Sequence, residues 1–255
     1  MMNGLRLEAT LLQLALYDVT RRVAVPRIGG VDDLRVRALR HAPLAGALVG
    51  LGGALALWLG AVVLGPAVGA MLSLIVVVFM TRGWGWRGFA ATFDALASGR
   101  RRTEVLARMS LPGLDGAGGL ALVLGIGLYA ALLSGLPAEV AGVALITVLG
   151  LGQMARVHVK ATTLAVRREG MKARLFEVTD DGYRMALAQT LLLCAGPVLV
   201  SGPAAGLAAG LGAVVSGQVM RWVFVTRLGG YTREGLAAVQ ICAELGALLG
   251  IALVA

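Results

Sequence analysis

PLAGALVGLGGALALWLGAVVLGPAVGAMLSLIVVVFMT, residues 43–81, carries no charged side chain from its first residue to its last. One helix needs about 20 predominantly apolar residues to cross the hydrocarbon core of a bilayer. Gly65-Pro66 divides the stretch, because glycine permits the backbone of a tight turn and proline is favoured in the first turn of a new helix. We predict membrane-spanning helices at 43–64 and 65–81 that form a hairpin.

The rest of the chain repeats this arrangement. Hydrophobic residues make up 58% of the 255 positions and charged residues only 15%, a composition too apolar for an ordinary soluble domain. Five further apolar blocks predict spans at 115–134, 137–155, 186–201, 203–225 and 236–254. Gly/Pro turns after the third and fifth spans close two more hairpins. The sequence predicts an all-α, polytopic integral membrane protein, with about seven transmembrane helices arranged as three hairpins plus a final span in one membrane domain, residues 1–255.

None of the 23 Lys and Arg residues lies in a hairpin turn. Because basic residues are retained on the cytoplasmic side of a membrane, we expect the N-terminus in the cytoplasm and Ala255 outside, at the bacterial cytoplasmic (inner) membrane. The cytoplasmic segments are then 1–42, 82–112, 156–185 and 226–235. Anionic lipid of the inner leaflet accounts for the net charge of +9, so the lipid bilayer is a partner and nucleic acid is not.

Two expectations concern packing. Residues 1–19 predict an amphipathic helix at the membrane interface, with apolar content from Leu11, Leu12, Leu14, Ala15 and Leu16. Small residues let helices approach closely in lipid, so Gly50 and Gly210 are predicted at helix contacts.

The sequence contains only two cysteines and two histidines. Cys194 and Cys242 stand inside apolar spans, where a thiol behaves as a small hydrophobe. His41 stands at a membrane boundary and His158 in a basic segment predicted as a loop, so both are predicted to be interfacial or solvated. The sequence contains no hydrolytic triad, P-loop or dinucleotide fingerprint.

The connection after the second span is the most unusual segment. It predicts a loop with two tryptophans, Trp84 and Trp86, followed by a short helix and a run of arginines. The tryptophans fit an interfacial aromatic belt. Guanidinium groups bind phosphate through paired hydrogen bonds, so the arginines are predicted to bind a lipid or substrate phosphate. They are Arg82, Arg87, Arg100, Arg101 and Arg102.

The last span contains a carboxylate. Glu244 lies inside a largely apolar run, and Gln240 shares its helix face one turn earlier. Because a carboxylate is costly at that depth unless it faces a cavity or a partner, Glu244 is a functional candidate. Just before this span, Gly229 and Gly230 permit close backbone approach to a ligand, and Glu234 adds a second carboxylate.

These segments resemble cobalamin synthase, a membrane enzyme family that joins adenosylcobinamide-GDP to α-ribazole or its phosphate and releases GMP. The resemblance extends over most of the chain. It is carried by Thr20-Arg21, Val25-Pro26, residues 43–50, residues 80–83, Gly118-Gly119, the Arg156 region, Arg168-Glu169-Gly170 and residues 229–232.

The family's usual pattern is G-x-H-x-D-G-x-A-D-x-x-D-G, whose three aspartates share a helix face that can hold Mg²⁺ against a diphosphate. At those positions this chain has Arg87, Ala91 and Asp94, and its histidine position is Gly85. Near the C-terminus one family glutamate is Ile241, whereas Glu244 is kept. The resemblance implies Mg²⁺ as cofactor, Asp94 as metal ligand or base, and Asp94, Glu234 and Glu244 as the catalytic acids. Asp94 could share the metal with Glu234 or Glu244, or Arg82 and Arg87 could neutralise the diphosphate in place of the metal.

Three functions stay open. The first is a transferase that uses adenosylcobinamide-GDP and α-ribazole as substrates. A second is a non-enzymatic relative that binds a phosphorylated ligand or lipid without turnover. A transporter is the third, although no inverted repeat is evident. A homo-oligomer is possible in each case.

Overall fold

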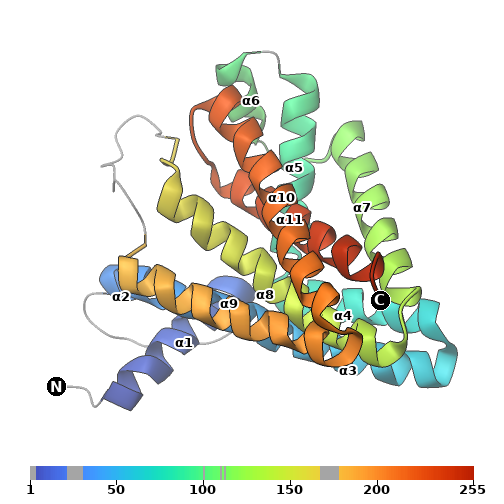
Figure 1. The fold of residues 1–255 in the computed structure, drawn as a ribbon. Coiled ribbons are helices and arrows are strands. Elements are labelled where there is room, and N and C mark those ends of the chain that lie inside the picture. The colour runs from blue at the N-terminus through green and yellow to red at the C-terminus, as the bar shows by residue number, and fades with distance from the viewer. Residues whose placement is uncertain (1–3, 22–30, 100, 110, 112, 167–177) are drawn as a thin grey trace.

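The computed structural model describes residues 4–21, 31–99, 101–109, 111, 113–166 and 178–255 of the chain (Figure 1). The helices are α1 (Gly4–Thr20), α2 (Val31–Ala38), the 3-10 helix η1 (Leu39–His41), α3 (Ala42–Leu64), α4 (Pro66–Thr81), α5 (Trp84–Ser98), α6 (Arg102–Met109), α7 (Gly116–Ser134), α8 (Ala138–Thr162), α9 (Asp180–Ser201), α10 (Pro203–Leu228) and α11 (Arg233–Ala252). The all-α membrane architecture predicted from the sequence is confirmed: six helices are long and apolar enough to cross a bilayer, or seven if a bent pair counts as one span.

The bent pair is α4 and α5. The axis of the chain turns by 91° between Thr81 and Trp84. Arg82 and Gly83 make this turn with φ of +54° and +64°, values in the left-handed region that glycine tolerates best. The predicted loop with two tryptophans is therefore wrong, since Trp84 and Trp86 belong to the first turns of α5.

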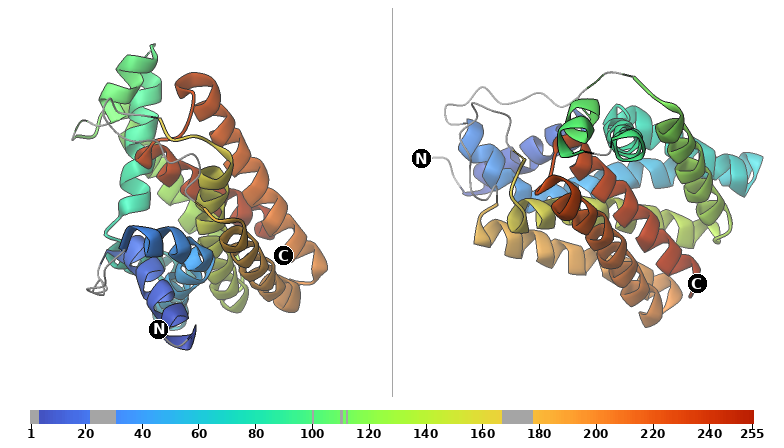
Figure 2. Two further views of the ribbon diagram at one scale, coloured as in Figure 1. Left: turned by 90° about the vertical axis from the view of Figure 1, so that its left-hand side faces the viewer. Right: turned by 90° about the horizontal axis from the view of Figure 1, so that it is seen from above.

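The hairpin turns lie where glycine and proline predicted them. Gly65 and Gly202 have φ of +95° and +88°, and each is followed by a proline in the first turn of the next helix. The turn before α8 ends at Pro137, which is the residue preceding that helix. α10 and α11 also lie side by side and antiparallel, as Figure 2 shows.

α8 and α11 form the interior of the bundle. About 72% of the apolar window of α8 and 67% of that of α11 are buried, against 22% for α7 and 17% for α9. Gly50 of α3 packs directly on the backbone of Ile146, so its predicted helix contact is confirmed. The prediction for Gly210 is wrong, because a side chain there would meet no described atom within 4 Å. Gly212, two residues later, packs on the backbone of Gly246 in α11.

The N-terminal segment forms the predicted helix, α1. Its buried residues include Leu11, Leu14 and Ala15, which lie against the protein itself. Glu8 of this helix accepts a hydrogen bond from Arg40 at 3.0 Å and pairs with His41 at 2.8 Å. His41 is buried, and Gln189 of α9 contacts its other ring nitrogen at 3.0 Å. A solvated His41 is therefore wrong, because the ring is buried between α1 and α9, whereas its interfacial position stays a prediction.

α8 continues seven residues beyond the predicted end of the fourth span, to Thr162. It therefore contains His158, which was expected in a loop. The His158 ring contacts Tyr183 Oη and Gln218 Nε2, both at 2.9 Å. The fourth span was predicted to end before Arg156 because a charged residue is normally solvated. Arg156 is nevertheless only 6% exposed. A buried charge with partners does not interrupt a helix.

Candidate functional site

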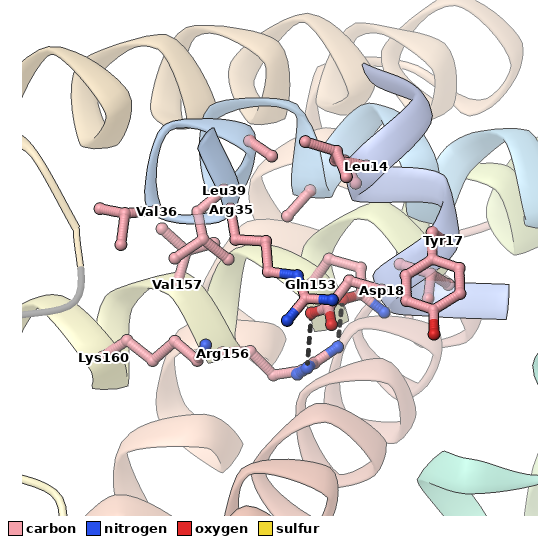
Figure 3. A pocket seen from close by; sticks show the side chains of 14 residues that line it. Leu14, Tyr17, Asp18, Arg35, Val36, Leu39, Gln153, Arg156, Val157 and Lys160 are labelled. Atoms are coloured by element: carbon pink, nitrogen blue, oxygen red, sulfur yellow. Dashed lines mark hydrogen bonds and ion pairs between the residues drawn. The ribbon is translucent and has the colours of Figure 1, made fainter. Parts of the chain in front are cut away.

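Arg156 lies at the centre of a polar cluster inside the bundle. Its guanidinium donates to Gln153 Oε1 at 2.7 Å and pairs with Asp18 of α1 at 3.7 Å. Figure 3 shows Arg156 and Gln153 of α8 facing Asp18. The Arg156 Nε atom is buried and has no hydrogen-bond partner among the described residues. Arginine is rarely this buried unless it has partners or a ligand.

Trp84 covers the other side of the guanidinium. The Arg156 Cζ atom lies 4.4 Å from the centroid of the Trp84 ring, and the Arg233 Cζ atom lies 6.0 Å from the same ring. These distances are within the range of cation–π attraction. The first turn of α5 and the first turn of α11 are thereby brought to α8.

Glu244 completes the cluster from α11. It is 2% exposed, and its Oε1 accepts a hydrogen bond from Gln240 Nε2 at 2.8 Å. The sequence-based prediction that these two side chains share a face is confirmed. Gly152 of α8 makes the space for Glu244, because a Cβ at Gly152 would lie 2.6 Å from Glu244 Oε1.

A narrow cavity of about 20 Å³ runs between these groups. It is lined by Trp84, Gln153, Arg156, Gln240 and Glu244, among others. With Asp18 these residues are called the Arg156 cluster below.

Two departures from the family pattern adjoin the cluster. Gly85 and Ile241 both line the narrow cavity, and a Cβ at Gly85 would lie 3.2 Å from Ile241 Cδ1. The positions at which the family pattern has a histidine and a glutamate are therefore neighbours across α5 and α11. In this chain they hold no polar side chain.

The electrostatics of the cluster favour an ionised Asp18. Burial raises the pKa of the Asp18 carboxyl, but the positive charges of Arg156 and Lys160 outweigh burial and hold that pKa below its ordinary value. A further cation, Arg21, pairs with Asp18 at 3.0 Å. The surroundings of Asp18 are therefore strongly cationic.

Asp94 lies in a different environment, at the other end of α5. Its carboxylate accepts a hydrogen bond from the backbone N–H of Asp115 at 2.9 Å and another from the backbone N–H of Gly118. Asp115 precedes α7 and makes no capping bond with its own side chain. Asp94 therefore caps the N-terminus of α7 from a neighbouring helix. The group of Asp94, Asp115 and Gly118 is called the Asp94 cap.

The described residues of this segment do not fit the three-aspartate magnesium site implied by the family pattern. Both Asp94 oxygens are used by backbone N–H groups, Ala91 offers no ligand atom, and Arg87 is cationic. Within the described ranges no group of three or more His, Cys, Asp or Glu side chains is placed to hold a metal ion. Magnesium bound here stays a prediction, and no step below depends on it.

The predicted phosphate-binding arginines lie on the surface. Arg82, Arg87, Arg101 and Arg102 are all exposed, and Arg100 falls outside the described residues. A Cβ at Gly229 would lie 3.9 Å from the Arg102 guanidinium, so α6 adjoins the turn between α10 and α11, as Figure 1 also shows.

The glycine pair of that turn has structural roles. Gly229 has a φ of +70° and ends α10. Gly230 is in contact with the backbone carbonyl of Leu164, where no side chain would fit. A ligand contact by this pair stays a prediction. Glu234, the second predicted carboxylate, is partly buried in the first turn of α11 against Gly88.

The sequence-based reading did not identify Asp18, Gln153, Arg156 or Lys160 as site residues. One signal was available: positions 153, 156 and 160 recur at helical spacing and place three polar side chains on one face. The contact of that face with α1 depends on packing between distant segments, which the spacing does not report.

Comparisons with known proteins give one family. The family described as cobalamin-5-phosphate synthase matches residues 14–252. Among curated proteins the chain is 35% identical over 252 residues to an adenosylcobinamide-GDP ribazoletransferase of Leptothrix cholodnii, covering 95% of each chain. Proteins of the same name from Azorhizobium caulinodans and Shewanella baltica are 33% and 32% identical, over 90% and 88% of this chain and 90% and 87% of their own. No solved structure matches.

Proposed function

The chain belongs to the cobalamin-5-phosphate synthase family, and from this we infer that it is an adenosylcobinamide-GDP ribazoletransferase. The observation that carries the inference is the match over nearly the whole length of relatives with that name. The structure adds a buried cluster of ionisable groups beside α5 and α11, which is unusual in a membrane protein unless the groups serve a function. The non-enzymatic alternative lacks comparable support.

The reaction moves a phosphoryl group. A ribose hydroxyl of the acceptor attacks the cobinamide-linked phosphorus of adenosylcobinamide-GDP. A new P–O bond forms, the P–O bond to GMP breaks, and GMP leaves with the electron pair. Such chemistry depends chiefly on positioning and on neutralising the charge of the diphosphate.

We assign the charge neutralisation to Arg82 in the turn before α5, Arg87 in α5 and Arg102 in α6. Arg87 lies one helical turn after Trp84, so a diphosphate bound by Arg82 and Arg87 reaches the edge of the Arg156 cluster. Glu244, oriented by Gln240, is the group assigned to accept the proton of the attacking hydroxyl. Glu234 and Asp94 stay predictions as catalytic residues.

Orientation and localisation are part of the proposal. The helices support a multi-pass membrane protein, and the distribution of basic residues supports a cytoplasmic N-terminus in the bacterial inner membrane. Single reporter cysteines in a Cys194→Ala, Cys242→Ala background test this. A cysteine at Ser98 should be shielded from an impermeant reagent in intact cells, whereas one at Gly202 should react. Labelling at Ser98 in intact cells would contradict the proposed orientation.

The activity itself is tested by release of GMP from adenosylcobinamide-GDP by the purified protein in detergent. We expect release only when α-ribazole or its phosphate is present. Binding of adenosylcobinamide-GDP without release would support the non-enzymatic relative instead. Adding EDTA, and then excess Mg²⁺, tests the predicted metal, because a required ion gives loss and recovery of release.

A further inference from the structure

The two sides of α8 border different cavities. The narrow cavity and another of about 230 Å³, between α1, α2 and α8, both reach Arg156. On the opposite side of α8 lies a cavity of about 340 Å³, whose walls come from α8, α9, α10 and α11 and are mostly apolar. This cavity is called the lateral groove, and its lining includes Leu151, His158, Tyr183, Cys194, Gly210 and Gln218.

The lateral groove opens toward the lipid and also extends into the bundle. Leu191 of α9 and Leu211 of α10 line it and are exposed. Val159 of α8 and Val239 of α11 line it as well, and both are buried. α9 and α10 diverge from their shared turn, as Figure 1 shows. An apolar chain can therefore enter from the side and reach the interior.

The length of the groove matches one leaflet of a bilayer. Eleven residues of α9 separate Tyr183 from Cys194, which is about 16 Å at 1.5 Å per residue. A bilayer core is about 30 Å thick, so the groove covers about half of it. Tyr183 lies in the first turn of α9, and His158 lies near the end of α8. The polar side chains are thus at the end of the groove where the membrane helices begin and end.

A chain of hydrogen bonds fixes the polar end. Arg221 donates to Gln218 Oε1 at 3.3 Å, and because arginine can only donate, this contact sets the orientation of the amide. The Gln218 amide nitrogen donates to His158 Nε2 at 2.9 Å, so that ring nitrogen accepts. His158 Nδ1 then carries the ring proton and donates to Tyr183 Oη at 2.9 Å. The Tyr183 hydroxyl hydrogen has no acceptor among the described residues, which leaves it for a ligand.

We propose that the lateral groove binds one acyl chain of a diacyl phospholipid, and that an ester carbonyl of this lipid accepts a hydrogen bond from the Tyr183 hydroxyl. The ester carbonyl is at the polar end of the acyl chain, as Tyr183 is at the polar end of the groove. Tyrosine suits this depth, since its ring is apolar and its hydroxyl is polar. A bound chain packs on α8 opposite Arg156 and so supports the helix that carries the Arg156 cluster.

The test compares an ester lipid with an ether lipid that lacks the carbonyl. Native mass spectrometry of the purified protein measures binding of dioleoyl phosphatidylcholine and of its diether analogue. Wild type should bind the ester lipid about twofold to tenfold more tightly, the effect of one neutral hydrogen bond. Tyr183→Phe should lose this preference and keep its affinity for the ether lipid. Tyr17→Phe removes a tyrosine hydroxyl on α1, away from the groove, and should keep the preference.

Two measurements locate the bound lipid. Cys194 lines the groove and Cys242 does not, so in a Cys242→Ala background added dioleoyl phosphatidylcholine should slow alkylation of Cys194 by N-ethylmaleimide at fixed detergent. Gly210→Leu places a side chain in the open space beside Gly210 and should abolish lipid retention. Ala204→Leu is the control, because Ala204 is exposed on the same helix but does not line the groove.

Three outcomes would overturn the proposal. Equal affinity of wild type for the ester and ether lipids would reject the hydrogen bond from Tyr183. Equal losses for both lipids in Tyr183→Phe would assign that hydroxyl a structural role only. Lipid retention that is unchanged in Gly210→Leu, or alkylation of Cys194 that lipid does not slow, would reject the groove as the binding site. None of these measurements uses GMP release, so they leave the proposed transferase function to its own test.

Discussion

The two ends of α5 differ in what their buried polar groups do. At the end near Ser98, both carboxylate oxygens of Asp94 accept hydrogen bonds from backbone N–H groups at the start of α7. At the start of the helix, Trp84 lies over Arg156, whose Nε has no partner in the described structure and whose guanidinium borders two cavities. The first arrangement is complete within the protein. The second leaves hydrogen-bonding capacity and charge for a ligand.

The separation of the two regions has a consequence for the chemistry. Ten residues separate Trp84 from Asp94, which is about 15 Å along a helix at 1.5 Å per residue. One metal ion cannot contact both regions. The presence of Asp94 at a family position therefore does not show that the reaction takes place there. The capping of α7 also accounts for this residue.

Removal of the Arg156 guanidinium is expected to have the largest effect on activity. In Arg156→Met the volume is largely kept, but Gln153 and Asp18 lose their partner and both cavities lose a charge. We expect kcat/KM for GMP release to fall by about a hundredfold or more, as for loss of one preorganised donor at a reacting centre. A lysine at this position should recover part of the activity. An unchanged rate in Arg156→Met would move the reaction away from this cluster.

Substitutions at two glycines, one at each end of the comparison, are expected to affect stability and activity differently. Gly118→Ala places a Cβ against Asp94 and the Ala90 carbonyl, and overpacking of this kind costs about 1–3 kcal/mol. Gly152→Ala places a Cβ against the side chains of Glu244 and Gln240 instead. We expect the first to lower the melting temperature more and the second to lower kcat more. Gly210→Ala, with open space around it, is the control and should change neither.

Asp94→Ala tests the cap directly. Loss of an N-cap acceptor costs about 0.5–2 kcal/mol of unfolding free energy, and the backbone N–H groups of Asp115 and Gly118 lose their acceptor. Thermal unfolding in detergent should show this loss, with a smaller one for Asp94→Asn, which keeps one oxygen acceptor. Wild-type stability in Asp94→Ala would contradict the assignment of a capping role.

The smallest expected effect is a dependence on pH. Because the folded pKa of Asp18 is lowered by its cationic neighbours, its contribution to stability is present at neutral pH. The contribution is lost as pH falls below the ordinary aspartate value of 3.8 toward the folded pKa. Melting temperatures between pH 7 and pH 3 should therefore fall less steeply in Asp18→Asn than in wild type. Parallel curves would mean that these cations do not lower the pKa of Asp18 in the folded protein.

Much of the fold could be predicted from local signals. Apolar length and the pairs Gly65-Pro66 and Gly202-Pro203 located the hairpins, since helix length and turn conformation are set by neighbouring residues. The 3.6-residue period placed Gln240 beside Glu244. The arginines before, within and after α5 also predicted binding of a lipid or substrate phosphate, which stays a prediction.

The remaining features depend on contacts between distant segments. Arg156 was taken as the end of a span because a charge is normally solvated, but α1 and α5 bury it with Asp18 and Trp84. Gly210 and Gly212 are indistinguishable by residue type, and only the approach of α11 decides which one is in contact. The role of Asp94 likewise depends on the position of α7.

Paired substitution of Glu244 and Asp94 tests the central claim, that the reaction takes place at the Arg156 cluster and not at the Asp94 cap. GMP release should be measured for Glu244→Gln and Asp94→Asn at equal amounts of folded protein. Loss of a general base lowers kcat by about a hundredfold or more, so we expect that loss in Glu244→Gln. Asp94→Asn should stay within about tenfold of wild type, because it keeps an acceptor for the α7 backbone. The reverse order, with release abolished in Asp94→Asn and near normal in Glu244→Gln, would contradict the account and return the chemistry to α5 and α7.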